Sequence, residues 1–138
     1  MMQSGASAYS TREHELPKKA AIRDMQPAMA PWQARCIQGY IAVNLHTTIS
    51  TMDLGRVVNF RPFRLNRAFR VIFGCTPHQY VIRRRIARAQ SLMLMSNDSL
   101  GQIAAECGFV DQSHLSNLFY KVVGTRPGAW RRIRTAQH

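Results

Sequence analysis

Apolar residues recur every three or four positions through most of the chain, and this spacing is typical of helices that pack on one face. The pattern begins near Trp32 and continues to about Trp130. No segment shows the strict alternation of apolar and polar residues that marks a half-buried strand. We therefore predict an all-α fold of about seven helices with no sheet.

Short polar residues, glycines and prolines divide this pattern into separate helices. A hydroxyl or carboxylate before the first turn accepts a bond from a free backbone N–H, whereas glycine or asparagine tolerates the left-handed conformation that ends a helix. Helix starts are predicted at Ser50, Pro62, Thr76, Ser99, Asp111 and Thr125 or Arg126, and helix ends at Asn59, Gly74, Gly108 and Gly124.

One short helix, tight turn and longer helix occur twice along the chain. Matches at an offset of 49 or 50 residues pair Leu54, Asn59, Phe60, Leu65, Phe69, Gly74 and Pro77 with Ile103, Gly108, Phe109, Leu115, Phe119, Gly124 and Pro127. This is the helix-turn-helix arrangement in duplicate. We predict units at about 51–74 and 99–123, joined by a linker helix at about 76–95.

The second helix of each unit has one apolar and one polar face. Its predicted buried positions are Leu65, Ala68, Phe69 and Ile72 in the first unit, and Leu115, Leu118, Phe119 and Val122 in the second. Arginine, asparagine, glutamine and serine can pair with base edges, and an apolar side chain can contact a thymine methyl. The predicted DNA-facing residues are Arg61, Phe63, Arg64, Asn66, Arg67 and Arg70 in the first unit, and Gln112, Ser113, His114, Ser116, Asn117 and Tyr120 in the second.

Other interpretations of these faces stay open at the level of sequence. A polar helix face is often only solvated, Phe63 is equally compatible with folding onto its own domain, and His114 with bracing its helix start. Arg84, Arg85 and Lys121 are candidates for contacts with phosphates, which set affinity and register without reading sequence.

Charge narrows the class of partner. The chain carries a formal net charge of +12, and from Gln33 onward fifteen basic residues face only four acidic ones. A segment this basic favours a polyanion, with double-stranded DNA first and an anionic membrane surface second. We expect residues 1–33, which show no sustained period, to form a flexible arm, and residues 135–138 a tail. No apolar run is long enough for a membrane span, so we expect a cytoplasmic protein without membrane contact.

The cysteines and histidines indicate neither a cofactor nor a metal site. Cys36, Cys75 and Cys107 are far apart and form no CxxC pair, and we expect Cys36 and Cys107 to be small core residues. An enzyme would need Cys75 with His78 or Cys107 with His114, but no third orienting group accompanies either pair. We therefore expect a protein that is not an enzyme.

The length of the linker helix suits joint use of both units. About 20 residues span about 30 Å, which is close to the pitch of B-DNA, about 34 Å. The two polar faces differ in sequence, so one monomer is expected to bind an asymmetric site. The alternative is a nucleoid-type protein that reads only backbone and shape.

The segments "PHQYVIRRRIARAQSLM" and "LGQIAAECGFVDQSHLSNLFYKVVGTRPGAW" resemble the DNA-binding domain of AraC/XylS-family bacterial transcription regulators. The resemblance covers about residues 34–134. It implies two homeodomain-like helix-turn-helix subdomains that bind promoter DNA and usually activate RNA polymerase. By position, it implies base-facing roles for Phe63, Asn66, Arg67, Ser113, Ser116 and Asn117.

Several residues depart from the family pattern. Members commonly have arginine where Asn117 stands, glycine where Asn59 stands, and tyrosine where Trp130 stands. Most members also carry a larger effector-binding domain, which about 33 residues cannot form. We expect this chain to resemble the short members that lack a small-molecule effector domain and are controlled by their amount.

Overall fold

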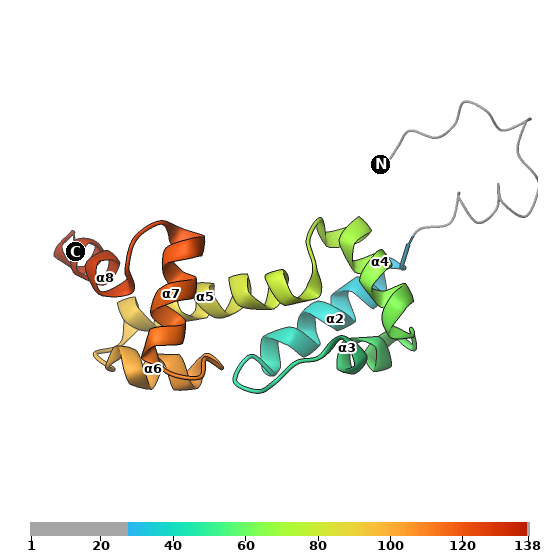
Figure 1. The fold of residues 1–138 in the computed structure, drawn as a ribbon, viewed down its shortest axis with the longest axis horizontal. Helices are drawn as coiled ribbons and strands as arrows, with labels where there is room; N and C mark the ends of the chain where they lie inside the picture. The colour runs from blue at the N-terminus through green and yellow to red at the C-terminus, as the bar shows by residue number, and fades with distance from the viewer. Residues whose placement is uncertain (1–27, 138) are drawn as a thin grey trace, which may run out of the picture.

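The computed structural model describes residues 28–137, which fold into seven helices with no strand (Figure 1). Their bounds are α2 Pro31–Val43, α3 Thr51–Val58, α4 Pro62–Phe73, α5 Pro77–Met95, α6 Leu100–Glu106, α7 Gln112–Val123 and α8 Pro127–Ala136. The all-α prediction is confirmed, and α8 runs six residues beyond Trp130, where the sequence pattern ends.

The predicted flexible arm needs a correction at its end. Residues 1–27 lie outside the described residues. Met29, however, is buried in the core of the first unit, and α2 already begins at Pro31. An isolated methionine shows no periodicity, which is why the sequence pattern placed the fold boundary too late.

The helices form two lobes at opposite ends of α5 (Figure 1). One core collects α2, α3, α4 and the first turns of α5, where Val81 is buried. The other collects α6, α7, α8 and the later turns of α5, where Ile86, Ala89 and Met93 are buried. The long helix is therefore shared by both cores, and it sets the separation of the two units.

Local capping explains where these helices begin. The Ser50, Thr76 and Ser99 hydroxyls each accept a bond from the backbone N–H three residues on, and the Asp111 carboxylate does the same for His114. Each cap satisfies a backbone donor that has no partner inside its helix. These four predicted starts are confirmed.

The turn inside each helix-turn-helix has the same construction. Asn59 and Gly108 adopt positive φ angles of 61° and 86°. The chain then reverses so that Phe60 N–H donates to the Gly55 carbonyl at 2.8 Å, and Phe109 N–H to the Ala104 carbonyl at 2.9 Å. A Cβ on Gly55 would collide with the Phe60 carbonyl oxygen, so the turn packs against α3 too closely for a side chain at this position.

Two arginine side chains connect the lobes to α5 through hydrogen bonds to backbone carbonyls. Arg85 on α5 donates through Nε to the Leu45 carbonyl at 3.0 Å, and through a terminal nitrogen to the Thr47 carbonyl. Arg131 on α8 donates to the carbonyls of Met93, Ser96 and Asp98 at 2.6–3.0 Å, which pairs backbone acceptors at and beyond the end of α5. Charged donors make strong bonds of this kind.

Gly108 lies where the two lobes meet. A Cβ at this position would collide with the Leu45 carbonyl oxygen and would lie 2.8 Å from Arg85 Nε. The turn of the second unit therefore packs directly against the loop of the first, and only a residue without a side chain fits between them.

Candidate nucleic-acid interface

The outer face of α4 is exposed and cationic. All six residues predicted to face DNA in the first unit are exposed: Arg61, Phe63, Arg64, Asn66, Arg67 and Arg70. Phe63 is 74% exposed, so it does not fold onto its own domain. The Arg67 guanidinium carbon lies 5.7 Å from the centroid of the Phe63 ring, which gives this face an apolar group with a cation beside it.

The outer face of α7 is polar and nearly neutral. Gln112, Ser113, Asn117 and Tyr120 are exposed, whereas His114 and Ser116 are half-buried. Lys121 is the one cation among the residues of α7. The structure thus leaves all six predicted residues of the first unit and four of the six in the second unit exposed, although α4 and α7 differ in charge.

The predicted buried stripes are wrong at their last positions. Leu65, Ala68 and Phe69 are buried, but Ile72 is 40% exposed, and in the second unit Val122 is 44% exposed. The core-facing places are taken by Phe73 and Val123, which continue the spacing of four from Phe69 and Phe119. Near a helix end, the sequence pattern did not decide between these neighbouring apolar residues.

His114 braces the start of α7, as one of the open interpretations held. Its Nδ1 accepts the Val110 backbone N–H at 3.1 Å, and its ring packs edge-on against Phe109 with centroids 5.5 Å apart. With Nδ1 an acceptor, a neutral imidazole carries its proton on Nε2. That N–H is the group His114 retains for an external acceptor.

Arg126 joins the α7 face, although the sequence pattern indicates only a helix start at this position. Its Nη1 donates to Asn117 Oδ1 at 3.2 Å, and its guanidinium carbon lies 4.8 Å from the centroid of the Tyr120 ring. Arg126 follows the end of α7, so no spacing within that helix could identify it. The repeat offers one signal, because the position corresponds to Thr76.

The three candidate phosphate contacts divide into two groups. Arg84 and Lys121 are exposed. Arg85 is half-buried, and two of its three side-chain nitrogens donate to the Leu45 and Thr47 carbonyls, so the structure does not favour the phosphate contact predicted for it. Partial burial removes water from the Arg85 guanidinium, and this lowers the pKa of the group. The sequence could not separate Arg84 from Arg85, because the carbonyl partners of Arg85 lie about 40 residues earlier.

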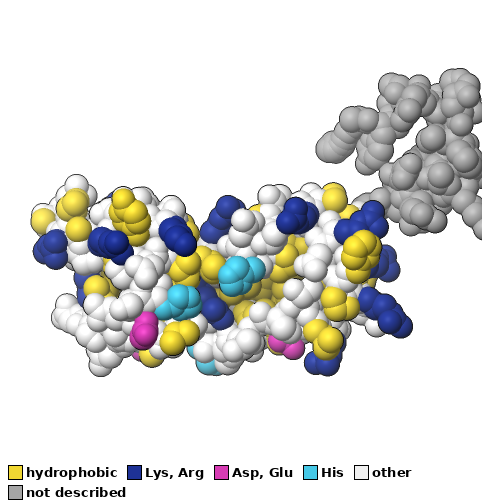
Figure 2. All heavy atoms as spheres, in the orientation of Figure 1, with side chains coloured by type: hydrophobic (Ala, Val, Ile, Leu, Met, Phe, Trp, Pro, Cys, Tyr) yellow, Lys and Arg dark blue, Asp and Glu magenta, His cyan; other side chains and the backbone are white. Residues whose placement is uncertain are grey.

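Few carboxylates oppose this positive charge. Within residues 28–137 the structure shows one salt bridge, between Arg56 and Asp53 at 3.8 Å. Lys and Arg side chains are spread over both lobes on the face that Figure 2 shows, with few Asp and Glu side chains among them. The arginines of α4 therefore present their charge to solvent and to any polyanion that approaches.

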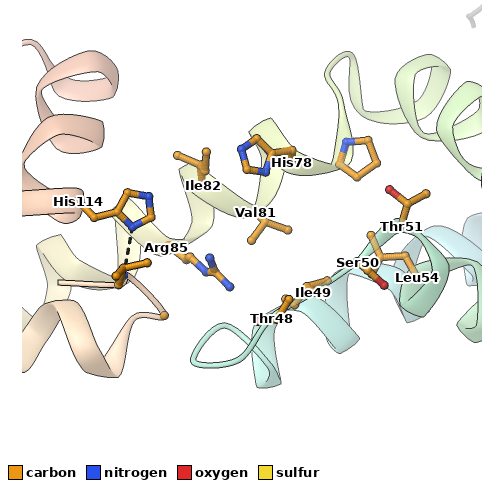
Figure 3. A pocket seen from close by; sticks show the side chains of 13 residues that line it. Thr48, Ile49, Ser50, Thr51, Leu54, His78, Val81, Ile82, Arg85 and His114 are labelled. Carbon is orange, nitrogen blue, oxygen red and sulfur yellow. Dashed lines mark hydrogen bonds between the residues drawn. The ribbon is translucent and has the colours of Figure 1, made fainter.

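A cleft of about 350 Å³ separates the two lobes (Figures 2 and 3). Val81, Ile82 and Arg85 of α5 form part of its lining, as do the loop before α3 and the start of α7. The imidazoles of His78 and His114 come from different lobes and lie on its border (Figure 3).

The cysteines do not form an activated site. Cys75 and Cys107 are buried, and burial raises the pKa of the Cys107 thiol, which is the opposite of what a nucleophile requires. Cys36 is exposed, so its predicted core position is wrong: Ile37 and Ile41 take the core-facing positions of α2, and Trp32 is exposed as well. No group of three metal-ligating side chains occurs in the described part of the chain.

None of the helices in residues 28–137 combines the length and apolar character that crossing a bilayer requires.

Comparison with known proteins places the fold and these faces in context. A family model described as a helix-turn-helix domain matches residues 54–133. The probable transcriptional regulator LumQ of Photobacterium leiognathi is 35% identical over 91 residues, which are 66% of this chain and 37% of LumQ. The HTH-type transcriptional activator RhaS of Escherichia fergusonii is 39% identical over 72 residues, which are 52% of this chain and 26% of RhaS. The chain thus spans well under half the length of these relatives.

Two solved structures show the same architecture. The DNA-binding domain of AdpA, a global transcriptional factor crystallised with a target DNA, has a TM-score of 0.72 and 26% identity, covering 77% of this chain and 95% of that one. A transcriptional regulator from Chromobacterium violaceum with an AraC-type DNA-binding domain has a TM-score of 0.70 and 25% identity, covering 74% of this chain and 91% of that one.

Proposed function

This chain belongs to the AraC family of helix-turn-helix transcription regulators, and we propose that it is a sequence-specific DNA-binding regulator. In the proposed complex, α4 and α7 act as recognition helices in two successive major grooves on one side of the duplex. One chain contains both helices, so it binds an asymmetric promoter site as a monomer.

The observation that carries this proposal is the exposure of two equivalent helix faces with base-pairing groups. Both faces follow turns of the same construction, and both belong to lobes fastened to one helix. The 19 residues of α5 span about 28 Å at 1.5 Å per residue, close to one turn of B-DNA at about 34 Å. This supports simultaneous entry of both helices.

The two helices have different tasks in this proposal. On α4, Arg67 pairs with a guanine, Asn66 with an adenine, and Phe63 contacts a thymine methyl. On α7, Gln112, Ser113, Ser116 and Asn117 make hydrogen bonds to base edges, and His114 donates through Nε2. Arg61, Arg64, Arg70, Arg84 and Lys121 lie toward the backbone and add affinity without sequence preference, whereas Tyr120 belongs to the base-facing side of α7.

The relatives support a role in activation. RhaS is named a transcriptional activator, and the AdpA domain was crystallised on a target DNA. By analogy, this chain acts on the bacterial chromosome and contacts RNA polymerase at the promoters it occupies.

Selection of bound sequences from a pool of random duplexes tests the proposal. We expect one enriched asymmetric motif, bound at least a thousandfold more tightly than random DNA at physiological salt. A competition gel shift with random duplex measures this ratio. Arg35→Ala serves as the control for the loss of one positive charge, because Arg35 is exposed on α2 and belongs to neither recognition helix. Steep salt dependence with no enriched motif would instead identify a nucleoid-type protein that binds without sequence preference.

A further inference from the structure

Arg126 occupies a helix start where its side chain forms no cap. It is the N-cap residue of α8, which has no side-chain capping bond. The repeat places Thr76 at the equivalent position of the first unit, and the Thr76 hydroxyl caps α5 by accepting the Gln79 N–H at 3.1 Å. Arginine is a poor N-cap, and its charge lies at the positive end of the helix dipole. Because arginine at this position does not stabilise α8, we infer that the Arg126 side chain has a role outside α8.

The side chain of Arg126 lies on the recognition helix instead. It donates to Asn117 Oδ1 at 3.2 Å and lies over the Tyr120 ring at 4.8 Å. Asn117 and Tyr120 are exposed and lie one helical turn apart on the outer face of α7. These three residues form a cluster, here called the Arg126 cluster, that remains open to solvent.

The repeat also shows what the Arg126 cluster supplies. The positions of Asn117 and Tyr120 correspond to Arg67 and Arg70 on α4. The second recognition helix therefore lacks the guanidinium groups that the first one carries at these two positions. Arg126 brings a guanidinium to this place from outside the helix.

The chemistry of the Arg126 cluster favours guanine. Asn117 Oδ1, the acceptor an asparagine uses in its bidentate pair with adenine, is engaged by Arg126. The free polar groups are then N–H donors, the remaining ones of the guanidinium and those of Asn117 Nδ2. Guanine presents two acceptors, N7 and O6, in the major groove.

We propose that Arg126 is a specificity-determining residue that reads a guanine in the half of the site bound by α7, with Asn117 and Tyr120 as positioning residues. This inference rests on the proposed DNA-binding function and adds the base class that the second unit selects.

The Arg126→Thr variant tests the inference, because it removes the guanidinium and introduces the capping residue found at Thr76. We expect the melting temperature of the variant to rise, because threonine caps α8 better than arginine does. A raised melting temperature would exclude misfolding as the cause of any lost DNA binding. Affinity for the selected site should fall about tenfold to a hundredfold, the value of one good bidentate contact. The preference for guanine at one position should disappear. Arg132→Thr makes the same charge change at an exposed position of α8 and should leave that preference intact.

A double-mutant cycle separates positioning from folding. If Asn117 orients Arg126, Asn117→Ala should relax the guanine preference in the wild-type background and should not change the base preference at that position in the Arg126→Thr background. Independent effects of the two substitutions would contradict the positioning role.

Three results would overturn the inference. Unchanged affinity and base preference in Arg126→Thr would show that Arg126 does not contact DNA. An equal loss for every sequence, with the salt slope reduced by about one, would identify a phosphate contact instead. A wild-type protein with no preferred sequence would remove the proposed function itself, and measuring the wild type first distinguishes that failure from the other two.

Discussion

At the scale of single residues, Arg67 is the side chain from which we expect the largest base-specific effect on α4. It is exposed beside Phe63 and has no carboxylate partner among the described residues. Replacing it with alanine should cost about 1–3 kcal/mol of binding free energy and relax specificity at one base pair. Gel shifts with duplexes substituted at each position measure this. A loss that is equal for all duplexes would show that Arg67 contacts only the backbone.

The three cysteines should differ sharply in reactivity. Cys36 is exposed on α2, whereas Cys75 and Cys107 are buried. Burial raises the pKa of Cys107, so its reactive thiolate is scarcer at neutral pH than that of a free cysteine. We expect a thiol reagent to modify one cysteine rapidly in the native protein and three after denaturation. Rapid modification of more than one thiol in the native protein would contradict the described packing.

The sequence predicted these residue-level features unevenly. It selected the exposed faces of α4 and α7 correctly, because helical periodicity separates opposite sides of a helix. It misplaced Cys36 and Ile72, because an adjacent apolar residue competed for the same core position. It also missed the engagement of Arg85 and the cluster formed by Arg126, since their partners belong to other segments.

At the scale of elements, the start of α3 should respond to pH. The Ser50 backbone N–H donates to Asp53 at 2.9 Å, and this bond, with that from the Ser50 hydroxyl, lowers the pKa of Asp53 below its usual 3.8. A carboxyl whose pKa is lower in the folded state stabilises the fold above its unfolded pKa. That contribution should be lost as the pH falls below 3.8 and through the lowered value.

Melting temperatures of wild type and Asp53→Asn, followed from pH 7 to pH 2, measure this effect. The two proteins should differ most at neutral pH, and the difference should narrow as acid protonates Asp53. A difference that stays constant across this range would show that the carboxylate charge does not contribute to the cap.

Helix bounds were predictable because caps are local. Ser50, Thr76, Ser99 and Asp111 each bond to a backbone group three residues away, so a short stretch of sequence holds all the information needed. The extension of α8 was not predictable in this way. Its Arg131 is held by carbonyls more than 30 residues earlier, which no local pattern reveals.

At the scale of the whole molecule, Arg85 should control how firmly the two lobes are held. Arg85→Ala removes the bonds to the Leu45 and Thr47 carbonyls. Leaving the Leu45 carbonyl, which lies in a part-buried place, without a partner costs about 1–3 kcal/mol, so the free energy of unfolding should fall by that amount. Affinity for the two-part site should fall while the base preference of each half persists. Denaturant unfolding and gel shifts measure both. Arg84→Ala, at an exposed neighbouring position, is the control for the free energy of unfolding only, because Arg84 is itself proposed to contact DNA phosphates.

The duplicated architecture followed from the sequence, because matching residues at offsets of 49 and 50 require two similar units. The relative placement of the two units could not be predicted from the sequence. It depends on Arg85 reaching the Leu45 loop and on Gly108 packing against the same loop, and these contacts join residues 40 or more positions apart.

The central claim is that two recognition helices, held apart by one rigid helix, enter successive major grooves on the same side of DNA. Its most direct test is the affinity for the selected site after five base pairs are inserted between its two halves. Half a helical turn would place the second half on the opposite side of the duplex. We predict that affinity falls to the level of a site with one half scrambled, whereas undiminished affinity for the lengthened site would contradict the account.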